Sequence, residues 1–180
     1  MIYIIIGVVI LLILWAIATY NSFVALIERV NNAKSQIAIQ IESRWDAIKS
    51  LIDATKQYSK HEAETLENIT AQRTAVGSGS SISDMEQAEA QLGQVMGRLI
   101  AVSEAYPDLK ASNVYQTTMQ KIDKYEDNVR QSRMIYNDTV TRYNRKIRAF
   151  PASLLANMFG FVSKPYFQGT EAKQEMPSWD

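Results

Sequence analysis

The longest uninterrupted apolar stretch lies at the N-terminus, where residues 2–18 read IYIIIGVVILLILWAIA and no charged residue occurs before Glu28. At about 1.5 Å per residue these positions cover roughly 25 Å as a helix, and extension to Leu26 crosses the ~30 Å hydrocarbon core of a bilayer. The pattern predicts a transmembrane anchor over residues 1–20. The anchor residues that we expect to face lipid or its interfaces are Ile2, Tyr3, Leu11, Leu14 and Trp15.

A cleaved signal peptide is the alternative interpretation of this segment, because Ala16-Ile17-Ala18 resembles a small-x-small cleavage site. The apolar run begins at residue 2, however, and lacks the basic region with which a signal peptide starts. Basic side chains follow the run at Arg29, Lys34 and Arg44, and none precedes it. The positive-inside rule therefore predicts a single-pass protein with its N-terminus outside and the rest of the chain in the cytoplasm.

Apolar residues after the anchor recur at steps of three and four, which is the period of a helix. The stretch from Asn21 to about Tyr58 contains neither Gly nor Pro, so we expect the anchor helix to continue into a soluble helix. The residues that form one apolar face of this helix are Ile37, Ile41, Ile48, Leu51 and Thr55.

Three breaks divide the chain that follows. Residues 59–62 have the spacing of a capping box and predict a second helix to about Val76, although one unbroken helix is the alternative because no Gly or Pro forces a turn. Residues 77–81, GSGSS, predict a loop, and a second capping box over 83–86 predicts the start of a third helix. Tyr106-Pro107 ends that helix.

A last long helix, from about Asn113 to Ala149, carries a heptad stripe with two seams. Such a stripe predicts the core of a bundle, with an intermolecular coiled coil as the alternative. Glu126 and Arg133 interrupt the second seam, and we expect them to reach solvent at the bundle edge; a register-fixing polar contact is the alternative. The first seam holds Tyr115, Ile122, Val129, Tyr136 and Tyr143, and the second holds Met119, Glu126, Arg133, Val140 and Ile147.

Residues 151–168 form an apolar and aromatic segment, and the polar tail over 169–180 is predicted to be disordered. Residues 150–161 contain more large apolar side chains than a protein surface normally exposes to water. We therefore expect these side chains to pack on the bundle, on a neighbouring subunit or on lipid. These side chains are Phe150, Leu154, Leu155, Met158, Phe159 and Phe161.

Basic side chains without acidic ones accompany this segment between residues 139 and 170. They complement the C-terminal end of a helix dipole or contact anionic lipid headgroups. If four helices alternate in direction, the last one returns the segment to the membrane and brings Phe159 near Tyr20; an unbroken first helix would put it at the far end. The basic residues are Arg142, Arg145, Lys146, Arg148 and Lys164.

Composition restricts the chemistry further. Charges balance at 19 basic and 19 acidic residues, so we expect no nucleic-acid partner. The lack of cysteine excludes disulfides, thiolate zinc sites and cysteine nucleophiles. His61 is the only histidine, with Thr65 where HExxH needs a histidine and Tyr58 where Glu-x-x-His needs a glutamate. We predict no catalytic residue, metal site or cofactor. The alternative is a divalent metal held by His61 and nearby carboxylates, Glu62, Glu64 and Glu67.

Short motifs in a fixed order resemble the LemA family of bacterial membrane proteins over roughly residues 20–167. Residues 56–62, KQYSKHE, are similar to the family's KxYxxHE block, and residues 106–111 match its turn. Phe159-Gly160-Phe161 and Tyr166-Phe167 match its C-terminal signature. The resemblance implies an all-α fold in which an N-terminal transmembrane helix continues into an up-and-down four-helix bundle over residues 21–150. It implies no defined biochemical activity.

We therefore expect a non-enzymatic scaffold anchored in the bacterial cell (inner) membrane, which self-associates as a homo-oligomer or docks an unidentified protein partner. Membrane lipid is the other expected partner. One alternative is a membrane-remodelling assembly of many anchored copies. The other is a metal-binding or enzymatic helical bundle around His61.

Overall fold

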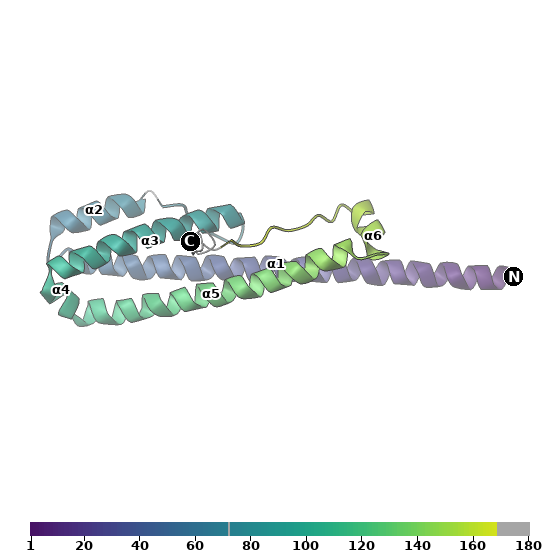
Figure 1. Cartoon of the computed structure of the whole chain (residues 1–180), viewed down its shortest axis with the longest axis horizontal. Coiled ribbons are helices and arrows are strands. Elements are labelled where there is room, and N and C mark those ends of the chain that lie inside the picture. Colours follow the sequence, from purple (N-terminus) through teal and green to yellow (C-terminus); the bar gives the residue numbers. More distant parts are fainter. Residues whose placement is uncertain (72, 169–180) are drawn as a thin grey trace, which may run out of the picture. The chain divides into compact units, whose positions relative to one another are not determined.

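A computed structural model describes residues 1–71 and 73–168, and the predicted disorder of residues 169–180 lies outside this range. The described residues form helices and no strand, which confirms the all-α class (Figure 1). They divide into two compact units, the first of Met1–Ala33 and Met134–Tyr166, the second of Lys34–Arg133 with Phe167 and Gln168. The helices are α1 Ile2–Thr55, α2 Lys60–Ala71, α3 Ile82–Ala105, α4 Pro107–Ala111, α5 Asn113–Arg148 and α6 Ala152–Met158.

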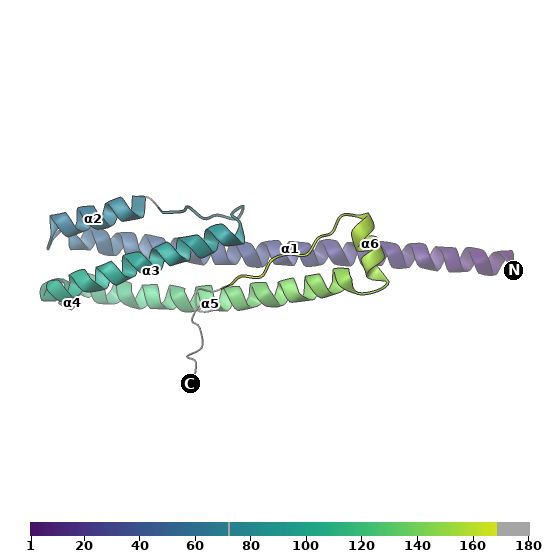
Figure 2. The ribbon, with the colours of Figure 1, turned by 45° about the horizontal axis from the view of Figure 1, so that its top comes forward.

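The second unit is a bundle built around the predicted apolar face of α1. Its α2 lies beside α3, and α3 contacts α4 (Figure 2). Each predicted residue of that face is buried, because a period of three and four keeps it on one side of the helix. Other buried side chains that complete this core include Leu66, Met85, Leu92, Leu99 and Ile122.

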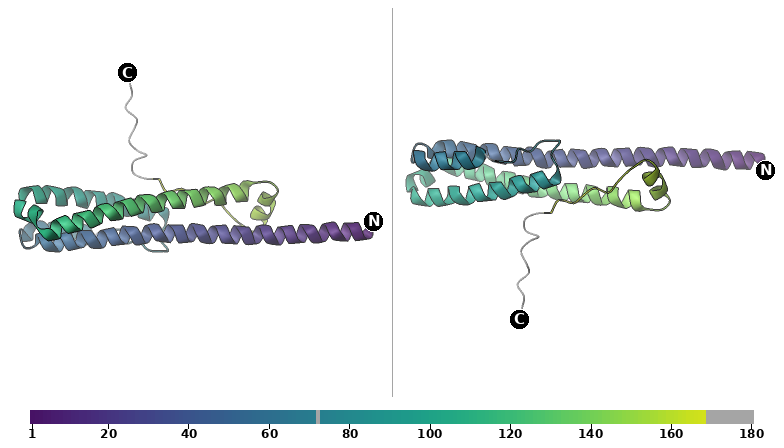
Figure 3. Two further views of the ribbon diagram at one scale, coloured as in Figure 1. Left: turned by 90° about the horizontal axis from the view of Figure 1, so that it is seen from below. Right: turned by 90° about the horizontal axis from the view of Figure 1, so that it is seen from above.

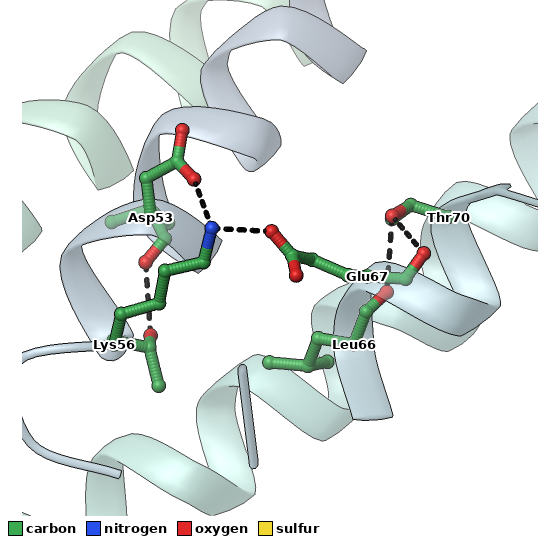
Figure 4. Close-up of polar contacts among 7 residues, drawn as sticks. Asp53, Lys56, Leu66, Glu67 and Thr70 are labelled. Carbon is green, nitrogen blue, oxygen red and sulfur yellow. Dashed lines mark hydrogen bonds and ion pairs between the residues drawn. The ribbon is translucent and has the colours of Figure 1, made fainter. Parts of the chain in front are cut away.

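The break near Ser59 is confirmed, because α1 ends at Thr55 and α2 begins at Lys60. The hydroxyl of Ser59 accepts a hydrogen bond from the Glu62 amide at 3.3 Å, as expected of a helix N-cap. Lys56 then joins the two helices, since its ammonium group contacts both Asp53, at 3.1 Å, and Glu67 (Figure 4). The second helix ends at Ala71, earlier than the predicted Val76.

The capping box of α3 lies two residues before its predicted position at 83–86. Ser81 is the N-cap: its hydroxyl accepts from the Asp84 amide at 3.1 Å, and its own amide donates to the Asp84 carboxylate at 2.9 Å. The earlier start brings Ile82 and Met85 into the helix, where both are buried. The hydrogen bonds with Ser81 also lower the pKa of Asp84.

The polar residues of the second seam make ion pairs between helices. Glu126 is about half exposed, as expected, and also contacts Arg44 of α1 at 2.6 Å. Arg133 reaches solvent only in part, with 24% of its side chain exposed, and it also makes a polar contact: its guanidinium pairs with Glu89 of α3, whose side chain is only 5% exposed. A carboxylate this deeply buried needs a charged partner, and Arg133 is long enough to supply one.

The first unit consists of the start of α1, the end of α5, α6 and the segment after it. Helix α1 is long and apolar enough to cross a membrane, and its N-terminal stretch is almost entirely exposed. The predicted anchor residues Ile2, Tyr3, Leu11, Leu14 and Trp15 all lie on it and are all exposed. Beyond this stretch the unit has its own core, formed by Phe23, Val30, Tyr136, Val140, Tyr143 and Ile147.

Candidate functional site

The C-terminal apolar segment folds as a short helix, α6, that ends at a glycine. Gly160 has φ +72°, a left-handed conformation that favours glycine. The Phe161 amide donates to the Ala156 carbonyl at 2.9 Å, and the Gly160 amide donates to the Asn157 carbonyl at 3.3 Å. This is a Schellman motif, which stops the helix and reverses the chain. Figure 3 shows α6 beside α1 in both views.

An aromatic cluster joins the segment to α1. The ring of Tyr20 lies 4.9 Å from the ring of Phe159 and 5.7 Å from that of Phe161, both edge to face. Phe161 also lies 5.0 Å from the buried Phe23. Edge-to-face pairs of this kind add about 0.5–1.5 kcal/mol each to the burial of the rings. The expectation that Phe159 lies near Tyr20 is therefore confirmed.

A hollow of about 270 Å³ lies between α1 and α6, where the apolar run of α1 ends. Ala16, Ile17 and Tyr20 line one side, and Leu155, Met158 and Phe159 line the other. Phe150, Leu154 and Met158 are more than 60% exposed. An exposed group of large apolar side chains marks a surface that contacts lipid or protein.

The predicted basic residues Arg142, Arg145, Lys146 and Arg148 lie on the last turns of α5, in the same unit, and are exposed. Arg148 also donates to the Ser163 hydroxyl, at 3.0 and 3.3 Å from two of its nitrogens. The structure therefore gathers the predicted apolar and basic residues in one unit. Their contact with lipid or a partner stays a prediction.

After α6, residues 162–166 form no regular secondary structure, and their backbone is held on α5. The Tyr143 hydroxyl donates to the Val162 carbonyl at 3.0 Å, and the Tyr136 hydroxyl donates to the Pro165 carbonyl at 2.9 Å. Between them the Asn144 amide makes two hydrogen bonds to the backbone of Lys164, both at 2.9 Å. Burial raises the pKa of both tyrosines, so each keeps the proton that it donates.

The apolar pattern did not predict this arrangement, because the pattern places Tyr136 and Tyr143 only in the core and indicates no role for Asn144. The sequence contains one signal, because Asn144 directly follows Tyr143 of the apolar stripe. In the structure Asn144 is 5% exposed. A buried amide needs partners for its donor and its acceptor, and a peptide backbone offers both.

In the second unit, Phe167 contacts the ion pair of Arg133 and Glu89, and Gln168 contacts α3. Phe167 is 4% exposed, and its ring lies 4.7 Å from the Arg133 guanidinium in a cation–π contact. The Gln168 amide donates to the Glu86 carboxylate at 2.6 Å. These contacts bring the end of the C-terminal segment to α3 and α5.

His61, the centre of the alternative metal site, lies exposed on α2. Over residues 1–71 and 73–168, no group of three or more histidine or acidic side chains is placed to hold a metal ion.

Comparison with known proteins gives the family. The LemA family model matches residues 33–180. Protein LemA of Metamycoplasma hominis is 29% identical, over 81% of this chain and 67% of the relative. Magnetosome protein MamQ 2 of Paramagnetospirillum magneticum is 27% identical, over 83% of this chain and 64% of its own length. Magnetosome protein MamQ of Magnetospirillum gryphiswaldense is 25% identical, over 82% and 64%.

The chain thus spans less than two thirds of the length of these MamQ relatives. The family match and the exposed apolar helix together indicate a membrane protein. Because the family model covers most of its sequence, this chain belongs to the LemA family.

Proposed function

We propose that the protein is a non-enzymatic scaffold, anchored in the bacterial cell membrane by α1 and self-associating at the membrane surface. The observation that carries this proposal is the contact between Tyr20 and Phe159, whose rings lie 4.9 Å apart. Tyr20 lies two residues after the apolar run over residues 2–18, at the level where tyrosine side chains meet the headgroups. The apolar segment therefore lies at the membrane interface whenever α1 crosses the bilayer.

Lipid would cover what the chain itself leaves exposed. Phe150, Leu154 and Met158 are each more than 60% exposed, and burial yields about 25 cal/mol for each Å² of apolar surface. Arg142, Arg145 and Lys146 are close in sequence and exposed on α5. Each basic side chain near an anionic surface contributes about 1 kcal/mol of attraction.

A scaffold role fits the other features of the chain. The relatives reported above are named for the magnetosome or for the family, and none of these names states a reaction. Large apolar side chains are also exposed outside the anchor, with Met134 63% and Ile135 52% exposed on α5. Such side chains favour contact with another protein surface, and a second copy or a separate docking partner would provide it.

Arg29, Lys34 and Arg44 support an N-terminus outside and a bundle in the cytoplasm. The chain has no cysteine, so a single Gly79→Cys in the exposed 77–81 loop is a specific label site. A membrane-impermeant maleimide should label it only after the cells are opened. Labelling in intact cells would contradict this orientation and would place the bundle outside the cytoplasm.

The central experiment measures the depth of α6. Leu154→Cys, labelled with an environment-sensitive fluorophore in vesicles that contain anionic lipid, should be quenched by spin-labelled lipid. Gly79→Cys is the matched control and should be much less quenched. Equal quenching at both positions would reject the interfacial position of α6. Light scattering in mild detergent tests self-association, and the mass of a single copy would reject it.

A membrane-remodelling assembly is a second candidate, favoured by the exposed Leu154 and Met158 of α6, because a short apolar helix inserted among headgroups acts as a wedge. Particles of many copies that deform vesicles would favour it over a small scaffold. Stoichiometric metal in the purified protein would instead favour a bundle that binds metal near His61.

A further inference from the structure

We propose that Arg145, Arg148, Ser163 and Tyr166 form a site that holds the phosphate group of one anionic phospholipid. The proposal rests on the membrane anchoring proposed above and adds a defined headgroup contact to it. General attraction to an anionic surface, by contrast, needs no particular arrangement of side chains. All four residues belong to the first unit, and they come from the last turns of α5 and from the segment that follows α6.

The two arginines lie on one face of α5. Thr141, Arg145 and Arg148 follow one another at steps of four and three residues, which places them along one side of the helix. Arg145 and Arg148 are both exposed, and their positive charges repel each other at this spacing. A bound anion offsets this repulsion, and the planar guanidinium group matches the geometry of phosphate oxygens.

Hydroxyl groups of the returning chain complete this face. Arg148 donates to the Ser163 hydroxyl at 3.0 and 3.3 Å, so that hydroxyl can give its own proton to another acceptor. The Tyr166 hydroxyl lies 3.4 Å from that of Thr141, and Tyr166 is 45% exposed. Hydrogen bonding to Thr141 lowers the pKa of Tyr166 most, and the positive charges of Arg148 and Arg145 act in the same direction. Both arginines therefore act on the electrostatic surroundings of the tyrosine hydroxyl.

The two arginines differ from those that the second unit pairs with glutamates. There, Arg44 contacts Glu126 at 2.6 Å. Over the described part of the chain, neither Arg145 nor Arg148 forms an ion pair. The sequence between residues 139 and 170 contains no acidic side chain that could supply a partner. The two positive charges therefore favour an added anion.

The position of the site favours a lipid as the source of the phosphate. Phe161 precedes Ser163 by two residues, and its ring lies 5.7 Å from that of Tyr20 and 5.0 Å from that of Phe23 on α1. Tyr20 lies close to the end of the apolar run, where a spanning helix meets the headgroups. Phosphate at this level of a bilayer belongs to phospholipids. An anionic headgroup suits the two arginines better than a zwitterionic one, whose own cation offsets the phosphate charge.

Native mass spectrometry of the full chain in mild detergent, titrated with phosphatidylglycerol, measures the affinity of the site. We expect a single tightly bound lipid per chain, and weaker binding of phosphatidylcholine. Arg145→Gln combined with Arg148→Gln should weaken the binding about tenfold or more, because both charge-assisted contacts are lost. The matched control, Arg142→Gln with Lys146→Gln, removes two positive charges from another face of the same helix and should change the affinity much less.

Tyr166→Phe tests the site without a change in charge. It removes only the hydroxyl of an exposed side chain, so circular dichroism should match the parent while the affinity falls about two- to tenfold. Equal weakening by the two double variants would overturn the proposal, because binding would then depend on total charge. Unchanged affinity in Tyr166→Phe, or phosphatidylcholine bound as tightly as phosphatidylglycerol, would also overturn it.

Inorganic phosphate distinguishes a lipid site from a site for a free anion. In excess it should displace little phosphatidylglycerol, because the lipid also gains from apolar contacts with the first unit. Complete displacement would assign the site to free phosphate and overturn the assignment to lipid.

The quenching measurement on Leu154→Cys separates this site from the proposed function. Strong quenching at that position, without any difference between the two double variants, would reject the phosphate site and leave the scaffold standing. Equal quenching at Leu154→Cys and Gly79→Cys would reject the interfacial position of α6 and the lipid assignment together.

Discussion

Asn144 on α5 and Lys164 on the C-terminal segment are joined by two hydrogen bonds, which use the nitrogen and the oxygen of the Asn144 side-chain amide. The Asn144 nitrogen donates to the Lys164 carbonyl, and its oxygen accepts from the Lys164 amide, each at 2.9 Å. Two hydrogen bonds to one residue determine which position of the segment lies opposite Asn144, because a shift by one residue would turn the amide and carbonyl away. This pair therefore sets the register of residues 162–166 on α5.

Asn144→Leu should release the segment, because it removes both hydrogen bonds and leaves the backbone of Lys164 without its partner. A loss of about 1–3 kcal/mol is expected, which raises the open population roughly 5- to 150-fold. Chymotrypsin cleavage after Phe161 or Tyr166 measures this opening. Gln131→Leu, an exposed position on the same helix, is the control. Equal cleavage rates in the two variants would show that Asn144 does not hold the segment.

Glu89→Ala should destabilise the second unit by about 3–5 kcal/mol, because it leaves the Arg133 guanidinium largely buried without its carboxylate. Arg130→Gln is the matched control: Arg130 is exposed and lies 4.0 Å from Glu126, a pair worth about 0–1 kcal/mol. Urea unfolding of the full chain in detergent, followed by circular dichroism, compares the two. Similar midpoints would contradict a structural role for Glu89.

Val129→Asp and Tyr136→Asp should each cost several kcal/mol, on the order of 3 or more, because each puts an unpaired charge at a buried position of the first seam. Met134→Asp on the same helix is 63% exposed and should change stability little. Thermal unfolding measures the difference. If either core variant melts like Met134→Asp, the stripe faces water in solution.

The Ser81–Asp84 capping box predicts a pH dependence. Hydrogen bonds from Ser81 lower the pKa of Asp84 below its reference value of 3.8. A carboxyl group whose pKa is lower in the folded chain stabilises it above the unfolded pKa, and this stability is lost as pH falls through the folded pKa. The fall in urea midpoint between about pH 7 and pH 3 should therefore be smaller for Asp84→Asn than for the parent. Parallel falls would show that the Asp84 charge does not contribute.

Local features of the chain were readable from the sequence, because each depends on neighbours within a few residues. The apolar run before Glu28 predicts a span by length and composition alone. The helical period identified Ile37, Ile41 and Ile48 as core, and each is fully buried. The capping-box spacing at Ser59 predicted the start of α2, and in the structure the Ser59 hydroxyl accepts a hydrogen bond from the Glu62 amide.

Other features depended on residues that only folding brings together. Ser81 and Ser83 each have an acidic residue three positions later, and the burial of Ile82 and Met85 favours the first. Arg133 interrupts an apolar seam, and only the position of α3 supplies Glu89 as its partner. Nothing near Asn144 in the sequence indicates its partner, because the backbone of Lys164 reaches it only when the chain folds back along α5. The sequence determined the helices and their apolar faces, because these follow from local periodicity. The partners of the buried polar groups were decided by the tertiary structure, because such a group pairs with whatever the fold places within hydrogen-bonding distance.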